Sequence, residues 1–178
     1  MKKRISGDPF LSIALTLVIG GALSGCVSTY KVSIGITKEL KDYYAIYPSL
    51  EVDTVAVTQA EADEIKKGGI EDYFAPNSLR DRLAPFTVFF SDENTVPLTL
   101  TPGNRLWKEW KQKKPNTLAV IASLPHIPDM PASDPRMIFI PMKKHFLMAK
   151  RIYFQVEPQR IVRIPKKPQN PEAADNKK

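Results

Sequence analysis

Short runs in which apolar and polar residues alternate constrain the fold of this 178-residue chain more than any other feature. From Tyr30 to Ile36, large apolar side chains alternate with small or polar ones, which predicts a half-buried β-strand. Later runs are rich in β-branched and aromatic residues, which favour a pleated, partly buried surface. They predict seven further strands, at 50–57, 86–90, 96–100, 117–123, 137–142, 151–156 and 160–164.

Helical signals are few. The segment from Thr58 to Glu61 has the pattern of a capping box, which predicts a short helix over 60–67, and Gly68-Gly69 is a typical C-terminal stop. A second helix is expected at 104–113, with a turn or two of helix between 70 and 83. Many short strands and little helix predict an all-β fold, an antiparallel β-sandwich of about eight short strands with one to three short helical insertions.

The N-terminal segment has the pattern of an export signal. A basic start, Lys2-Lys3-Arg4, precedes an apolar stretch over 10–23. At roughly 14 residues, this stretch is shorter than the ~20 that span a membrane as a helix, and its length suits a cleaved signal peptide. The alternative is a transmembrane anchor. The stretch ends in Leu23-Ser24-Gly25-Cys26, which contains the only cysteine of the chain.

This ending resembles the bacterial lipobox, in which the cysteine receives a diacylglycerol before the signal is removed. The resemblance implies that residues 1–25 are cleaved and that Cys26 becomes the lipidated N-terminus; otherwise Cys26 is an ordinary buried thiol. In enteric-type lipoproteins an Asp after the cysteine retains the protein at the inner membrane. Val27 at this position implies an outer-membrane protein that faces the periplasm.

The rest of the chain is long enough for one domain and too short for two. We therefore expect a single domain over 26–164, separated from the lipid by only three residues, a reach of about 10 Å. Residues 165–178 contain no large apolar side chain and predict a disordered Pro/Lys tail. The net charge is +7, of which residues 1–25 and 165–178 each contribute +2. Outside the cytoplasm, a basic charge indicates anionic lipid, cell-wall polymer or an acidic partner rather than nucleic acid.

Groups suited to catalysis are scarce. No nucleophile-elbow, zinc-protease, P-loop or dinucleotide-binding motif occurs. Glu51 and Asp53 share one face of a predicted strand, so they are either a carboxylate pair or part of a solvated or salt-bridged face. Asp129 and Asp134 flank a proline-rich loop but lack the dense oxygen spacing of a calcium site. No metal site and no catalytic residue are predicted, and two histidines, His126 and His145, are expected at the surface or in turns.

Trp107 and Trp110 lie one helical turn apart in the predicted helix over 104–113, among several lysines. A basic amphipathic helix with two aromatic anchors is able to dip into lipid headgroups, which suits a domain tethered close to a membrane. The alternative, which is commoner for aromatic pairs on helices, is that both indoles close one end of the sandwich.

The order of segments is similar to that of the small lipoprotein of bacterial type VI secretion systems. In that family a proline-serine pair precedes the second strand, as Pro48-Ser49 does here, and a helical insertion follows. A Pro-Gly turn after a middle strand is matched by Thr101-Pro102-Gly103, and an apolar-Ile-Ala strand core by residues 118–122. Two strands close the sandwich, as 151–156 and 160–164 would.

The resemblance implies a non-enzymatic lipoprotein of the outer membrane that acts as a structural component of an envelope-spanning complex, the type VI secretion membrane complex. It implies a partner, the periplasmic domain of an inner-membrane secretion protein, and places the contact in the loop 38–47. Tyr43, Tyr44 and Tyr47 are the candidate anchors because tyrosine is frequent in binding hot spots, unless they cover the sandwich end. The covalent lipid on Cys26 is the only non-protein group expected.

Two other functions remain open at this stage. A ligand-binding lipoprotein for cell-wall glycan or lipid predicts a concave pocket lined by aromatic side chains. A hydrolase that uses Glu51, Asp53 or a histidine predicts these groups gathered in one cleft with shifted pKa values.

Overall fold

The computed structural model describes residues 29–125, 133–143 and 150–173. Within them the chain forms eight strands and four helices. In chain order these are β1 (Tyr30–Ile36), α1 (Lys38–Tyr44), β2 (Leu50–Val57), α2 (Gln59–Phe74), α3 (Leu79–Leu83), β3 (Phe86–Phe90), β4 (Leu98–Leu100), α4 (Leu106–Gln112), β5 (Thr117–Ala122), β6 (Met137–Pro141), β7 (Lys150–Glu157) and β8 (Arg160–Ile164).

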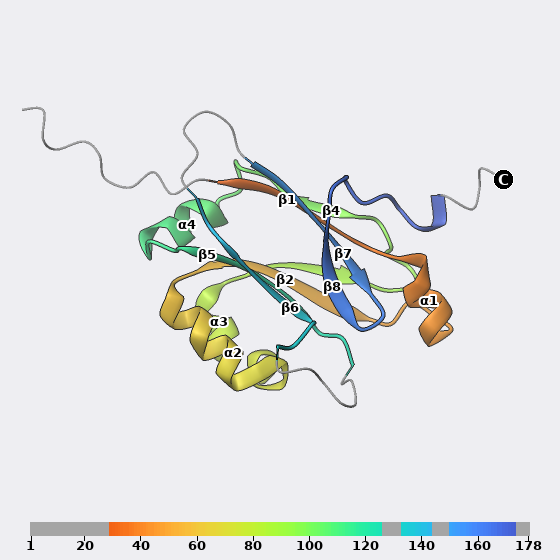
Figure 1. The fold of residues 1–178 in the computed structure, drawn as a ribbon, viewed down its shortest axis with the longest axis horizontal. Helices are drawn as coiled ribbons and strands as arrows, with labels where there is room; N and C mark the ends of the chain where they lie inside the picture. The colour runs from red at the N-terminus through yellow and green to blue at the C-terminus, as the bar shows by residue number, and fades with distance from the viewer. Residues whose placement is uncertain (1–28, 126–132, 144–149, 174–178) are drawn as a thin grey trace, which may run out of the picture.

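The strands form two four-stranded sheets that pack face to face as a β-sandwich (Figure 1). Sheet A has the order β4-β1-β7-β8, and sheet B has the order β3-β2-β5-β6. The predicted all-β sandwich is therefore confirmed. All neighbouring strands run antiparallel except β1 and β7, which pair in parallel from Tyr30↔Lys150 to Ile36↔Val156. Strand β4, which follows Pro97, and strand β6, which ends in Pro141, are both sheet edges, where a missing N–H costs no ladder hydrogen bond.

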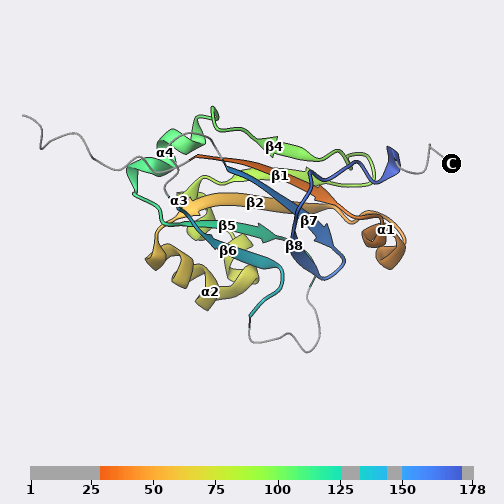
Figure 2. The same cartoon turned by 45° about the horizontal axis from the view of Figure 1, so that its top comes forward.

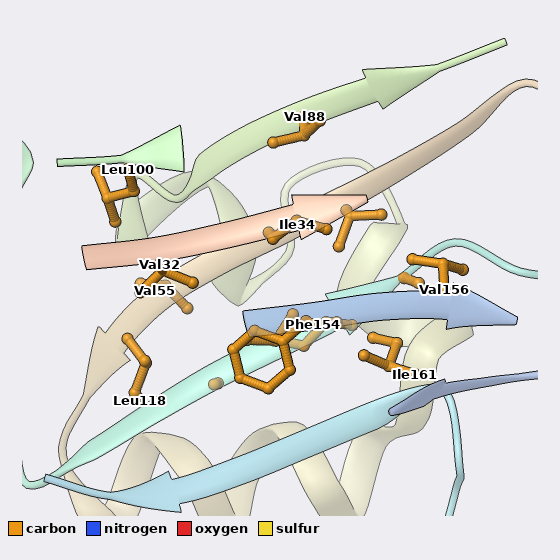
Figure 3. Packing of buried hydrophobic residues seen from close by; sticks show 14 of the residues in the cluster. Val32, Ile34, Val55, Val88, Leu100, Leu118, Phe154, Val156 and Ile161 are labelled. Carbon is orange, nitrogen blue, oxygen red and sulfur yellow. The ribbon is translucent and has the colours of Figure 1, made fainter. Parts of the chain in front are cut away.

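The core between the sheets is made of aliphatic and aromatic side chains that point inward from alternate strand positions (Figure 3). Val52 of β2 lies opposite Val88 of β3 and Ala122 of β5, and all three are buried. From sheet A, Phe154 and its neighbours on β1 contribute the other half. Each large side chain removed from water in this way contributes about 1.5–3 kcal/mol to the free energy of folding.

Helices α2 and α3 cover the outer face of sheet B (Figure 2). The predicted capping box of α2 is confirmed: Thr58 Oγ1 accepts from the Glu61 amide, and the Glu61 carboxylate accepts from the Thr58 amide at 2.8 Å. The predicted stop at Gly68-Gly69 is only a kink. Gly69 adopts φ 77°, a left-handed conformation that glycine tolerates, and a second helical stretch then continues to Phe74 because Ile70 and Tyr73 are buried.

The sandwich has two ends, and a different short helix lies at each of them (Figures 1 and 2). At the end that we call the α4 end, β1, β5 and β7 begin, β2 and β6 finish, and α4 lies across the opening. At the opposite end, the α1 end, β1 finishes and α1 follows directly. No helix among the described residues is long and apolar enough to cross a membrane.

Candidate functional site

The segment that follows β1 is a helix and not the loop that was expected. Helix α1 runs from Lys38 to Tyr44 and is held by a single buried side chain, Leu40. It ends at Ala45, which takes a left-handed conformation with φ 66°. Two large apolar side chains remain outside at this turn: Tyr43 is 58% exposed and Ile46 is 56% exposed.

The three candidate tyrosines have different environments. Tyr43 and Tyr44 stack edge to face, with ring centroids 4.8 Å apart. The Tyr44 hydroxyl donates to the Pro158 carbonyl at 2.9 Å, and burial, followed by the neighbouring Tyr43, raises its pKa. Gln159 Nε2 donates to the Tyr43 hydroxyl at 3.0 Å, so the turn between β7 and β8 supports both rings. Tyr43 is accessible to a partner, and Tyr44 is only partly accessible.

Tyr47 does not fit the prediction of a contact anchor. It is 3% exposed, and its ring lies under the Lys41 ammonium, which is 5.3 Å from the ring centroid. Its backbone amide donates to Asp92 Oδ1 at 2.9 Å, which ties α1 to the connection after β3. For Tyr47, the alternative prediction that the tyrosines cover the sandwich end describes the structure.

The C-terminal segment 165–173 completes the α1 end. Instead of the disorder that its composition predicted, it forms a strap across the outer face of sheet A (Figure 1). Pro168 is buried against Gly35 of β1; a Cβ placed on Gly35 would lie 2.6 Å from Pro168 Cβ. Thr95 Oγ1 donates to Asn170 Oδ1 at 2.9 Å. The strap is ordered because a glycine leaves room for it; residues 174–178 lie outside the described residues.

Three shallow hollows surround α1, and none has the shape of a ligand pocket. One, of about 440 Å³, lies between α1 and the strap and is lined mainly by Lys38, Lys41, Asp42 and Glu172. Another, of about 450 Å³, lies between the strap and the end of β1, and the third borders Tyr43 at the β7–β8 turn. Their linings contain one tyrosine each at most. A glycan-binding or lipid-binding site with aromatic walls is not formed by these hollows.

An arginine that the sequence analysis did not single out, Arg80, binds both members of the candidate carboxylate pair. Asp53 is fully buried on the outer face of sheet B, where Arg80 Nε donates to its Oδ2 at 2.6 Å. Arg80 also donates to the Glu51 carboxylate, so one guanidinium bridges both acids. Thr87 Oγ1 and the Tyr73 hydroxyl donate to Asp53 at 2.6 and 3.1 Å.

This cluster is a structural ion-pair network. Burial opposes the charged form of Arg80, but hydrogen bonds and charge from Asp53 and Glu51 outweigh it and raise the pKa of the guanidinium. Burial, and then the charge of Asp53, raises the pKa of Tyr73, so its hydroxyl stays a donor. An acid whose oxygens already accept four hydrogen bonds has no lone pair directed at a substrate. The salt-bridged interpretation of Glu51 and Asp53 therefore describes the structure, and the solvated one does not.

A second arginine, Arg136, is buried and secures the other side of the helix layer. Arg136 is 1% exposed; it donates to Asp134 Oδ2 at 2.8 Å, to Glu71 Oε1 at 3.1 Å and to the Leu124 carbonyl at 3.0 Å. Asp134 is therefore committed to this guanidinium. Asp129 and the histidines at 126 and 145 lie outside the described residues. Within the described ranges, no group of three or more potential metal ligands gathers.

Both tryptophans of α4 point into the protein. Trp107 and Trp110 are each 2% exposed and stack edge to face at 5.1 Å. Their Nε1 atoms donate to the carbonyls of Thr101 and Ala84, at 3.0 and 3.2 Å. The prediction that these indoles contact lipid is wrong, because both rings are enclosed; they close the α4 end of the sandwich.

Arg80 and Arg136 were not singled out by the sequence analysis, and no short motif marks them. Arg80 lies 27 residues from Asp53, and Glu71 lies 65 residues from Arg136, so only the folded chain brings these charges together. Their sequence neighbours do not mark them either: Arg80 lies between Leu79 and Asp81, and Arg136 lies between Pro135 and Met137.

The described geometry defines a class: a small β-sandwich with helices over one sheet and a separate helix after the first strand. Solved structures share this fold. Lip of Serratia marcescens, a membrane-bound component of the type VI secretion system, matches with a TM-score of 0.52 and 12% identity over 78% of this chain and 98% of that chain. TssJ1 of Pseudomonas aeruginosa, a type VI secretion lipoprotein, matches with a TM-score of 0.50 and 9% identity over 78% and 98%.

A third similar structure is the C-terminal domain of the type VI secretion protein TssM from EAEC. It matches with a TM-score of 0.53 and 8% identity, over 76% of this chain and all of that one. No protein-family model matches the sequence, and no curated protein matches it. At these identities the likeness establishes a shared fold.

Proposed function

We propose that this chain is a lipid-anchored structural component of an envelope-spanning complex of the type VI secretion kind, with Cys26 as the site of lipidation. The observation that carries the proposal is the shared fold, which extends over nearly the whole of two type VI secretion proteins, Lip and TssJ1. In this proposal the protein is held at the outer membrane, faces the periplasm, and has no catalytic activity.

The fold alone does not separate a lipoprotein from the C-terminal domain of TssM, because both kinds of protein share it. The sequence makes the distinction. A basic start, an apolar stretch and the ending Leu23-Ser24-Gly25-Cys26 support export and lipidation of this chain. Within this proposal, the chain is therefore one of the lipid-anchored proteins and not one of the proteins that bind to them.

The contact surface in this proposal is the α1 end. Tyr43 and Ile46, two of the five well-exposed large apolar side chains in the described residues, form the apolar part of this surface; the other three, Phe89, Val96 and Leu98, lie on β3 and on or just before β4. Tyr43 and Ile46 are three residues apart at the end of α1, and the hollows beside α1 are lined by charges of both signs, on Lys38, Asp42 and Glu157. Tyrosine and large aliphatic groups with a polar rim are typical of protein interfaces.

The anchor and this surface lie at opposite ends of β1. Tyr30, only four residues after Cys26, is at the α4 end, whereas α1 directly follows the far end of the strand. A domain lipidated at Cys26 therefore presents Tyr43 and Ile46 away from its own membrane, toward a protein that reaches across the periplasm.

The test is complementation of a deletion strain, scored by contact-dependent killing and by co-purification of inner-membrane secretion proteins. Cys26→Ser is expected to abolish killing by removing the anchor. Ile46→Asp is expected to leave the protein at the membrane but to abolish co-purification. Phe89→Asp is the matched control, since Phe89 has the same 58% exposure as Tyr43 but lies on β3, away from α1. Normal killing by the deletion strain would overturn the proposal.

A further inference from the structure

The α4 end carries a concentration of positive charge. Besides Lys113, which pairs with Glu61, seven basic side chains are exposed there, contributed by α4 and its flanks, the end of β6 and the start of β7: Arg105, Lys108, Lys111, Lys114, Lys143, Lys150 and Arg151. Segments far apart in sequence are brought together here. The Tyr30 hydroxyl accepts from the Lys143 amide at 2.8 Å, and Lys150 pairs with Tyr30 across β1 and β7. We call this set the basic end.

Little negative charge compensates the basic end. On α4, Glu109 is the single carboxylate, and it lies 3.9 Å from Arg105 Nε. Glu61, at the start of α2, is already used by the capping box and by Lys113, which is 3.8 Å away. Among the described residues, no carboxylate lies within ion-pair distance of the other six members of the basic end.

Among the described residues, the outside of the basic end is polar. Both indoles of α4 are buried, and none of the five well-exposed large apolar side chains belongs to this end. A surface with this much uncompensated positive charge attracts anionic headgroups through electrostatics. The binding surface that suits it best is flat and carries many negative charges.

The geometry points to a bilayer surface that contains anionic phospholipid as the occupant of the basic end. This inference rests on the proposed function, because Cys26 is four residues from Tyr30 and its lipid would enter the membrane beside these cations. The lipid anchors the chain, and the basic end sets the domain's orientation on the headgroups. The α1 end is thereby held away from the membrane in a defined direction.

The expected strength is sizeable because the charges act together. Each lysine or arginine close to an anionic bilayer strengthens its partition onto that surface about fivefold, and the effect decays within a Debye length of about 8–10 Å. Three lysines of α4 would thus multiply to roughly a hundredfold. The interaction must weaken steeply as salt is added, which an apolar insertion would not do.

The experiment measures orientation in the acylated, full-length protein. Lipidation blocks the thiol of Cys26, so one added cysteine can be labelled with a fluorophore: Gln112→Cys at the basic end or Gln169→Cys in the strap at the α1 end. Both positions are neutral and exposed. The proteins are reconstituted into phosphatidylcholine vesicles with or without phosphatidylglycerol, and a headgroup-labelled lipid serves as the quencher.

The expected result is several-fold stronger quenching at position 112 than at position 169 in the anionic vesicles only. Salt at about 1 M, where the Debye length is about 3 Å, should remove the difference. Charge reversal of Lys108, Lys111 and Lys114 to Glu should remove it as well. The matched control reverses three exposed lysines elsewhere, Lys67, Lys166 and Lys167, and should leave it unchanged.

Equal quenching of both labels in anionic vesicles would overturn the inference, as would quenching that survives the α4 charge reversal. Mass spectrometry of the N-terminal peptide from the same preparation decides separately whether Cys26 carries lipid. If it does not, the proposed function fails, and co-sedimentation of the unlipidated chain with anionic vesicles still decides whether the basic end binds them.

Discussion

The two ends of the sandwich are closed in the same way and exposed in opposite ways. Each end has a seven-residue helix with a pair of aromatic rings stacked edge to face, Trp107 and Trp110 in α4 and Tyr43 and Tyr44 in α1. In α4 both rings are buried and the outside is basic, whereas in α1 one ring and Ile46 are left in solvent. The comparison teaches that an aromatic pair on a short helix does not reveal by itself which end is a contact surface; burial decides it.

The largest expected effect is on the free energy of unfolding when one aromatic ring is removed at each end. Trp110→Ala removes a buried indole and leaves the Ala84 carbonyl without its donor, so the free energy of unfolding should fall by about 3–5 kcal/mol. Tyr43→Ala, at an exposed position, should lower it by less than about 1 kcal/mol. Urea unfolding followed by circular dichroism measures both, and equal losses would show that the ends are not different.

A smaller effect tests the strap that completes the α1 end. Gly35→Ala places a Cβ against Pro168 and should cost about 1–3 kcal/mol or displace the strap. Displacement should speed tryptic cleavage between Lys166 and Lys167. Gly103→Ala, before α4, is the matched control, because a Cβ there meets nothing within 4 Å. If both substitutions leave cleavage and stability unchanged, the strap does not depend on the space at Gly35.

A still smaller effect sharpens the difference between two helix starts. Thr58 caps α2 with its hydroxyl, whereas Thr37 precedes α1 with a buried hydroxyl that has no hydrogen-bond partner. Thr58→Val should lower the free energy of unfolding by about 1 kcal/mol. Thr37→Val removes an unsatisfied buried oxygen and should be neutral or stabilising. Thermal unfolding of the pair is the measurement, and a loss at Thr37 similar to that at Thr58 would contradict the assignment.

The smallest expected effect is a pH dependence in the helix layer that belongs to neither end. A hydrogen bond from its own backbone amide, and then Arg136, lowers the pKa of Glu71. The resulting stability is present above the unfolded pKa of about 4.3 and is lost as the pH falls through the lower folded value. Because the Glu71 side chain is 64% exposed, the contribution should be under about 1 kcal/mol.

Unfolding measured across the acid range, with Glu71→Gln as the comparison, tests this prediction. The substituted protein should lose less stability between about pH 5 and pH 3 than the unsubstituted one. Identical pH profiles would show that the ion pair with Arg136 adds nothing.

Sequence reasoning predicted the strands well because their signal is local. The bounds of β1 were predicted from alternating residues and those of β2, β3 and β8 from runs rich in β-branched and aromatic residues, and each agrees with the structure to the residue. The predicted half-burial of β1 is wrong, since Ser33 bonds Thr99 of β4 and Gly35 is covered by the strap. A side chain on the outer face of a strand becomes buried when a segment distant in sequence covers it. The residue pattern of the strand itself does not indicate this burial.

The misses have the same physical origin. Helix α1 has no side-chain cap and only Leu40 buried, so its sequence is as polar as a loop. The strap is ordered by the absence of a side chain at Gly35, and the arginine networks join residues 27 and 65 positions apart. Of the candidate site, Tyr43 was predicted from its residue type; Ile46 and the strap became apparent only with the chain folded.

The position of β1 has a mechanical consequence. Cys26, β1 and α1 follow one another without interruption, so a pull between an anchor before Tyr30 and a partner on α1 runs along the covalent backbone of one strand. That strand spans about 23 Å and is held extended by β4 on one side and β7 on the other. The other strands then hold β1 straight while its covalent backbone carries the force. Their hydrogen bonds bear shear force only if the partner binds the strap or the β7–β8 turn instead of α1.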